Sequence, residues 1–132
     1  MILYHFSHPG HLPSILAERR LRTSESNVSI TKEHAGPDVV WLFDTPTVPP
    51  TTTKGSLYDE KRRVRITVNV PKAHVHRWTK WGPALSMSQT WKAAFVHAGG
   101  GMPAAKRWWV ATSPIPASNW LEVTLDGEPV EF

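Results

Sequence analysis

The sequence predicts one α+β domain, rich in antiparallel strands and with a few helices between them. Short apolar or alternating segments are typical of strands, and they recur at residues 2–7, 39–43, 63–70, 107–112 and 120–125. Segments with helical spacing of apolar residues interrupt this series. Twelve prolines and eight glycines among 132 residues favour short elements joined by tight turns. No repeat or linker divides the chain, so residues 1–132 are expected to form a single domain.

The first half of the chain is predicted to hold two buried strands and a helix. Residues 2–7 read as an apolar strand, and residues 13–21 as a helix. Pro13 suits the first helical turn, which does not use its missing N–H. The continuous apolar run 39–43 is typical of a central buried strand. Residues 44–56, rich in Thr and Pro, are expected to form a long loop and are a candidate lid over a site.

The second half of the chain shows the clearest patterns. Residues 63–70 alternate with aliphatic side chains on one face, which predicts a half-buried strand. Residues 86–98 carry apolar side chains at helical spacing, with a serine cap at the start and three glycines after the end. The segment 120–125 alternates, and the Asp-Gly pair at 126–127 predicts a hairpin into a terminal strand at 128–132.

Composition limits the classes of function. Lys and Arg number 15 against 11 Asp and Glu, a net charge of +4 that permits a nucleic acid or phosphorylated partner without requiring one. The chain has no cysteine, which excludes disulfides, a thiolate zinc site and a thiol nucleophile. It has no apolar run of membrane-spanning length and no signal-peptide pattern. We expect a cytoplasmic protein with no membrane partner, although the lack of cysteine would also suit a secreted effector.

Several polar features leave two readings open. His5, inside an apolar strand, has either a structural hydrogen bond or a place facing a ligand pocket. The polar loop 23–29 offers hydroxyl and amide groups to a ligand, or is a solvated surface. The basic run 61–65 is more typical of a solvated strand face than of a phosphate contact. His74 and His76 point to one side of an extended segment but have no third partner at a metal-ligand spacing, so we expect no metal site.

Residues 3–7 read Leu-Tyr-His-Phe-Ser, residues 11–16 read His-Leu-Pro-Ser-Ile-Leu, and Leu-Arg follows at 21–22. This order resembles the opening of ADP-ribosyltransferases. It is most similar to the DNA-targeting ADP-ribosyltransferase toxins, and more distantly to tRNA 2′-phosphotransferases and poly(ADP-ribose) polymerases. Two later landmarks of that superfamily have counterparts here: a strand bearing an aromatic residue, at 40–42, and a late strand followed by a turn and a last strand, at 108–125.

The resemblance implies an ADP-ribosyltransferase-like α+β fold, in which two small, mostly antiparallel sheets form a cleft with a few flanking helices. It also implies that NAD is the substrate. His5 would bind the hydroxyls of the nicotinamide-side ribose, and Ser7 would help to hold that ribose. Trp41 would occupy the place of the aromatic residue that stacks on nicotinamide, since an aromatic face suits a flat cationic ring.

One landmark departs from the family pattern. The catalytic Glu of the family opens the late strand, where this chain has Arg107 and Trp108. Glu122 on the next strand, expected on the same face as Trp120, is the candidate substitute that would stabilise the oxocarbenium-like centre. Because tRNA 2′-phosphotransferases use basic and polar residues instead of a Glu, Arg22 is a further candidate, placed to attract pyrophosphate.

Two functions follow from these residues. The first is an NAD-dependent ADP-ribosyltransferase that modifies a macromolecular acceptor, which could be DNA, RNA or protein. The alternative is a non-catalytic module on the same scaffold that binds a nucleotide, a nucleic acid or a protein. A third reading makes the tryptophans a protein-binding surface on an unrelated fold. The candidate site residues are His5 and Glu122 for catalysis and Ser7, Arg22 and Trp41 for NAD binding, with no metal.

Overall fold

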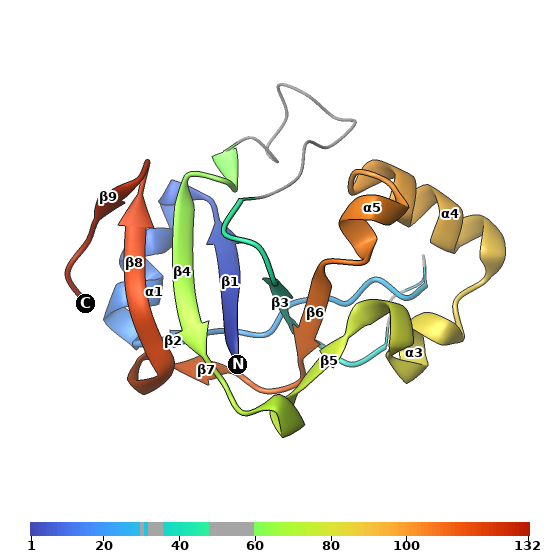
Figure 1. The fold of residues 1–132 in the computed structure, drawn as a ribbon, viewed down its shortest axis with the longest axis horizontal. Helices are drawn as coiled ribbons and strands as arrows, with labels where there is room; N and C mark the ends of the chain where they lie inside the picture. The colour runs from blue at the N-terminus through green and yellow to red at the C-terminus, as the bar shows by residue number, and fades with distance from the viewer. Residues whose placement is uncertain (30, 32–35, 48–59) are drawn as a thin grey trace.

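The computed structural model describes residues 1–29, 31, 36–47 and 60–132. Its largest element is a seven-stranded antiparallel sheet with the strand order β5-β6-β3-β1-β4-β8-β9 (Figure 1). Two further strands, β2 and β7, form a small second sheet. The predicted mixed α+β class with mostly antiparallel strands is confirmed.

The elements follow one another in the order strand, helix, strands, helices and strands. The strands are β1 (Ile2–Ser7), β2 (Arg20–Leu21), β3 (Val40–Phe43), β4 (Val64–Asn69), β5 (Val75–Arg77), β6 (Trp108–Ala111), β7 (Ile115–Pro116), β8 (Trp120–Leu125) and β9 (Glu128–Pro129). The α-helices are α1 (Leu12–Glu18), α3 (Gly82–Leu85), α4 (Gln89–Ala98) and α5 (Met102–Ala105). Single 3-10 turns are η1 (Pro9–His11), η3 (Lys72–His74), η4 (Trp78–Lys80) and η5 (Ala117–Asn119).

One half of the sheet packs against α1. Strand β4 lies between β1 and β8, and its predicted alternation is confirmed, since Val64, Ile66 and Val68 are fully buried. In Figure 1, α1 lies behind this half of the sheet. Leu12 from α1 joins the same buried cluster, so the helix covers one face of strands β1, β4 and β8.

The other half of the sheet supports an aromatic core. Trp78 from η4, Phe95 from α4 and Trp108 from β6 pack with ring centroids 5.0–5.9 Å apart. Edge-to-face and tilted contacts of this kind stabilise aromatic clusters beyond the area they bury. Helices α3, α4 and α5 gather at this end of the molecule (Figure 1). The two buried clusters share strands β3 and β6, because Leu42 and Ala111 belong to the first and Trp108 and Val110 to the second. Alternate residues of a strand point to opposite faces, so here the two cores lie on opposite faces of the sheet.

Helix α1 is shorter than the predicted helix over residues 13–21. It ends at Glu18 because Arg19 adopts a left-handed conformation with φ of 55°, and its N–H bonds the Ile15 carbonyl. The two following residues form β2 and pair with β7, more than ninety positions along the chain. Long-range strand pairing therefore overrides the local helical pattern.

The turn and helix ends predicted for the second half of the chain are largely confirmed. Asp126 and Gly127 both have positive φ, as a two-residue hairpin requires, and join β8 to β9. Ser88 caps α4 by accepting a hydrogen bond from the Trp91 N–H, and Gly99 follows the last residue of the helix. The terminal strand is two residues long instead of five. No helix in the described ranges is long and apolar enough to cross a membrane.

Candidate functional site

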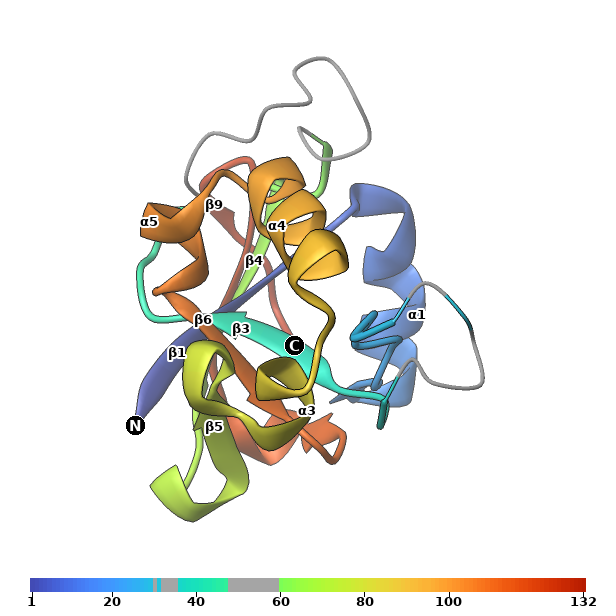
Figure 2. The same ribbon diagram turned by 90° about the vertical axis from the view of Figure 1, so that its right-hand side faces the viewer.

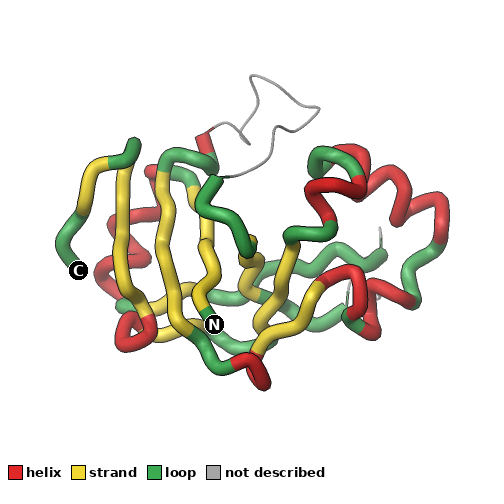
Figure 3. The backbone as a smooth tube through the Cα atoms, in the orientation of Figure 1, coloured by secondary structure: helices red, strands yellow, loops and turns green. Residues whose placement is uncertain are grey.

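The large sheet is only weakly joined between β1 and β3. Six residue pairs connect β1 to β4, whereas a single register pair, Tyr4 with Phe43, connects β1 to β3. Strand β3 runs obliquely away from β1 in the tube view (Figure 3). The side chain of His5 bridges the opening, with Nδ1 2.9 Å from the carbonyl oxygen of Trp41. The sheet thus opens between β1 and β3.

A cavity of about 600 Å³ lies at this opening. Its walls come from β1, the η1–α1 segment, β2, residues 23–27, β3, residues 61–62, the end of α4 and β6. In Figure 2, α4 lies above β3 and α1 lies to the right of it. Small-molecule sites commonly enclose roughly 300–1,000 Å³, so this cavity has room for a cofactor-sized ligand.

Four of the five predicted site residues line this cavity. His5 and Ser7 come from β1, Arg22 follows β2, and Trp41 comes from β3. These residues are up to 36 positions apart in the sequence, so the chain fold brings them together. The fifth, Glu122, is not among the lining residues.

A β-bulge places Glu122 on the other face of the sheet. The register between β4 and β8 shifts at Thr67/Val68, so that Trp120 pairs with Val68 but Glu122 pairs with Thr67. Adjacent strand residues point to opposite faces, and the expected common face of Trp120 and Glu122 is therefore wrong. Glu122 instead forms an exposed ion pair with Arg65 at 3.0 Å. It does not join the carboxylate-poor cavity beside His5.

The His5 imidazole is held in one tautomer. A carbonyl oxygen only accepts hydrogen bonds, so Nδ1 must donate its proton to Trp41, and Nε2 of the neutral ring carries the lone pair. Burial lowers the pKa of His5 most, and the positive charges of His11 and Lys61 lower it further, while the hydrogen bond to Trp41 partly opposes them. His5 is therefore neutral at physiological pH and presents a hydrogen-bond acceptor.

Aromatic side chains form one end of the cavity. Trp41 lies 5.9 Å from Phe95 and 5.9 Å from Trp108, measured between ring centroids. The indole N–H of Trp41 donates to the Glu25 carbonyl at 3.1 Å, which fixes the ring against residues 23–27. Phe95 packs in the aromatic core and also lines the cavity wall. This end suits a flat ring.

Cationic side chains form the other part of the wall. Arg20, Arg22, Lys61 and Arg62 all line the cavity, with Glu18 as the one carboxylate among its described lining residues. Glu18 accepts hydrogen bonds from both Nε and Nη2 of Arg22. Such an excess of positive charge favours an anionic ligand group such as a pyrophosphate.

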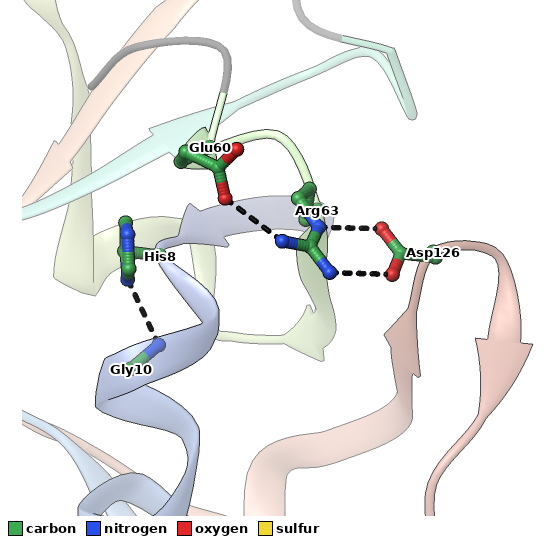
Figure 4. A network of polar contacts seen from close by, with 5 residues as sticks. All are labelled: His8, Gly10, Glu60, Arg63 and Asp126. Carbon is green, nitrogen blue, oxygen red and sulfur yellow. Dashed lines mark hydrogen bonds and ion pairs between the residues drawn. The ribbon is translucent and has the colours of Figure 1, made fainter.

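A polar network supports the basic segment at the cavity edge. Arg63 donates from Nε and Nη2 to the two carboxylate oxygens of Asp126, each at 2.9 Å, and from Nη1 to Glu60 at 2.8 Å (Figure 4). Asp126 raises the pKa of the Arg63 guanidinium, and Arg63 in turn lowers the pKa of Asp126. In the same view the His8 side chain accepts the Gly10 N–H. The network anchors the turn that carries Lys61 and Arg62 to β8.

Several cavity residues were missed or undervalued in the sequence. The basic run 61–65 was read as a solvated strand face, and Lys61 and Arg63 are indeed exposed. The sequence did not indicate that Lys61 and Arg62 also line the cavity. The polar loop 23–29 had two open readings, and Thr23, Ser24 and Asn27 line the cavity. Glu18, which also lines the cavity, was not among the candidate site residues. Its four-residue spacing from Arg22 could have flagged it, because Arg22 was already a candidate.

Ser7 lies deep in the wall beside a second histidine. Its side chain is 7% exposed, and its Oγ is 3.5 Å from Nδ1 of His11, at the limit of a hydrogen bond. His74 and His76, by contrast, are both exposed and are not among the lining residues. Within the described ranges, no group of three or more His, Asp or Glu side chains is arranged to hold a metal ion.

The predicted lid over residues 44–56 falls mostly outside the described residues, which resume at Glu60. No protein-family model, curated protein or solved structure matches this chain. The cavity geometry and the sequence motifs are therefore the basis for a functional proposal.

Proposed function

We propose that this chain is an NAD-dependent ADP-ribosyltransferase that uses the cavity between β1 and β3. The observation that carries the proposal is that one cavity of about 600 Å³ is lined by His5, Ser7, Arg22 and Trp41. These are the residues for which the resemblance to ADP-ribosyltransferases implied contacts with NAD. The opening in the sheet supports the finer fold assignment too, since the family fold has a cleft between two groups of strands.

The two ends of the cavity support a dinucleotide as the ligand. Nicotinamide would lie against Trp41 at the aromatic end, because a flat cationic ring is attracted to an indole face. The pyrophosphate would lie toward Arg20 and Arg22, whose guanidinium groups form charge-assisted hydrogen bonds with phosphate oxygens. Ring and phosphate binding would then fix the intervening ribose near His5.

His5 is suited to hold that ribose. Its Nε2 carries a lone pair while Nδ1 is bonded to Trp41, so the ring can accept a hydrogen bond from a ribose hydroxyl. A neutral imidazole also avoids repelling the positively charged nicotinamide ring of NAD. The contribution of His5 would be orientation, which lowers the entropic barrier to displacement at the adjacent anomeric carbon.

The acceptor would be a macromolecule. Basic side chains around the cavity and a net charge of +4 are compatible with a nucleic acid acceptor. The proposed reaction uses NAD as substrate and requires no metal.

A specific observation favours the alternative, a non-catalytic nucleotide-binding module. Glu122 lies on the face of the sheet opposite to His5, and the late strand begins with Arg107 and Trp108 where the family has its Glu. A cavity that binds a nucleotide but lacks a carboxylate free to assist transfer would bind NAD without turnover.

Nicotinamide release separates these two functions. The protein is incubated with NAD carrying labelled nicotinamide, alone and with single-stranded DNA, tRNA or protein acceptors, and NAD binding is measured in parallel by calorimetry. We expect release by the native protein and loss of release in His5→Ala, with His76→Ala, an exposed histidine outside the cavity, as the control. Binding without release would favour the nucleotide-binding module, and no binding at all would refute both functions.

A further inference from the structure

The proposed reaction requires a negative charge beside the ribose. When nicotinamide leaves, positive charge develops at C1′ and the ring oxygen, and a nearby carboxylate stabilises it. Glu18 is the one carboxylate among the described residues that line the cavity. It is the last residue of α1, on the wall that also carries Arg20 and Arg22.

Glu18 is engaged by an arginine in the ligand-free protein. Arg22 donates from Nε at 2.6 Å to one carboxylate oxygen and from Nη2 to the other. Arg20 Nε lies 4.0 Å from the carboxylate and adds a looser contact. The Arg22 side chain is 67% exposed and that of Glu18 is 27% exposed, and pairs so open to water are weakly held.

A phosphate group can compete for this arginine. The planar guanidinium fork matches two oxygens of a phosphate as well as two oxygens of a carboxylate. A pyrophosphate carries two negative charges into a wall that has four described cations, so it gains attraction from Arg20, Lys61 and Arg62 as well as from Arg22. Glu18 offers Arg22 a single charge and faces solvent.

We propose that ligand binding exchanges the partner of Arg22: the pyrophosphate of NAD takes the guanidinium, and the released carboxylate of Glu18 acts as the catalytic carboxylate of the transfer step. This inference rests on the proposed function. It supplies the negative charge that Glu122, paired with Arg65 on the other face, does not provide. It also makes the carboxylate available only when the phosphates are in place.

The step balances with the groups named. The bond between C1′ and the nicotinamide nitrogen breaks, and its electron pair leaves with nicotinamide, which becomes neutral. An oxygen of water or of an acceptor hydroxyl forms the new bond to C1′. Its proton passes to the Glu18 carboxylate and then to solvent. His5 holds a ribose hydroxyl through Nε2 and is not consumed.

The exchange predicts opposite effects of two substitutions on the binding of ADP, which contains the pyrophosphate but no nicotinamide. Glu18→Gln frees Arg22 from its competitor, so ADP should bind roughly two- to fivefold more tightly, the range set by an exposed ion pair. Arg22→Ala removes the phosphate partner, so ADP should bind roughly 10- to 100-fold more weakly. Isothermal calorimetry measures both.

If Glu18 is the catalytic carboxylate, its substitution should slow nicotinamide release although it strengthens ADP binding. Glu18→Gln should bind NAD at least as well as the native protein yet release nicotinamide roughly 100-fold more slowly. Glu18→Asp, which keeps the charge, should retain part of the rate, and thermal melting checks that each variant is folded. Glu122→Gln is the matched control, because it breaks another exposed carboxylate–arginine pair, on the face of the sheet away from the cavity. It should change neither ADP binding nor turnover.

The outcomes separate this inference from the proposed function. If a folded Glu18→Gln protein releases nicotinamide at the native rate, or binds ADP no more tightly than the native protein, the exchange is refuted. The proposed transferase function still stands in that case, provided that the native protein itself releases nicotinamide. A native protein that neither binds NAD nor releases nicotinamide overturns both. Tighter ADP binding combined with slower release supports the exchange, because a purely structural role for Glu18 would not improve binding.

Discussion

Substitution of Gly99 by alanine tests how tightly Trp108 is packed at the aromatic end of the cavity. A Cβ at Gly99 would lie 2.4 Å from Cζ2 and 2.6 Å from Cη2 of Trp108, so one of them must move. Trp108 is 6% exposed and is packed against Trp78 and Phe95, with centroids at 5.0 and 5.6 Å. Because the indole has little room to move, we expect Gly99→Ala to lower the free energy of unfolding by about 1–3 kcal/mol.

The backbone of Gly99 makes this an unusually direct test. Its φ of −84° is open to any residue, so the substitution carries no left-handed strain. Without the indole contact, Gly→Ala would stabilise the protein by roughly 0.4–1 kcal/mol through the unfolded chain. The two expectations have opposite signs, and urea denaturation followed by fluorescence distinguishes them.

Gly82 provides the matched control. It begins α3, and a Cβ placed there meets nothing within 4 Å, so Gly82→Ala should be neutral or stabilising. If Gly99→Ala proved as stable as Gly82→Ala with an unchanged slope of unfolding free energy against urea, Trp108 would have to be more loosely held than its contacts indicate. In that event the reasoning about a rigid aromatic end of the cavity would fail.

Further predictions concern stability, pH and ligand contact. Leu42→Ala in the fully buried centre of β3 should lower the unfolding free energy by about 2–5 kcal/mol, measured by urea denaturation. The pKa of His5 is lower in the folded chain, so native stability should decline as pH falls below about 6.5, where the unfolded chain gains the proton first. This decline should be absent in His5→Gln, and a native profile flat from pH 7 to 5 would contradict it. The pKa of Asp126 is lowered by Arg63, so the stability it contributes is present above its ordinary pKa of 3.8 and should be lost as pH falls below that value. In Arg63→Ala this acid-side loss should be smaller, as acid titrations followed by circular dichroism would show. Trp41→Leu should weaken NAD binding while leaving ADP binding largely unchanged, because in the proposed binding mode the indole contacts only the nicotinamide ring.

Local periodicity explains the parts of the fold that could be predicted. The alternation over residues 63–70 fixed which side chains of β4 are buried, and that inference needs no knowledge of neighbouring strands. The hairpin at Asp126 and Gly127 was equally local, since few residue pairs accept positive φ at both positions. These patterns depend on the chain's own geometry and do not change with its tertiary environment.

Long-range pairing explains where prediction failed. Nothing near residue 20 indicates that β2 will pair with Ile115, so the helix was extended too far. Likewise Glu122 was placed by simple alternation from Trp120, and the bulge opposite Thr67/Val68 reversed its face. A bulge is defined by the register between two strands, and a single alternating segment carries no record of it. That residues 61 and 62 line the cavity was missed for the same reason, because their place depends on the ion pair between Arg63 and the distant Asp126.

The two readings of His5 that the sequence left open are both part of one arrangement. Where β1 and β3 separate, the ladder loses hydrogen bonds, and the Trp41 carbonyl would cost about 1–3 kcal/mol if buried without a partner. The imidazole supplies that partner through Nδ1, which is the structural role. The same bond leaves Nε2 as the acceptor and, with burial, favours the neutral ring, which is the state that could accept a hydrogen bond from the ribose hydroxyl of the proposed ligand. An opening in a sheet therefore needs a side chain with two distinct polar atoms, one for the backbone and one for the ligand. Histidine meets that requirement with a rigid ring, and this accounts for a titratable residue in the middle of an otherwise apolar strand.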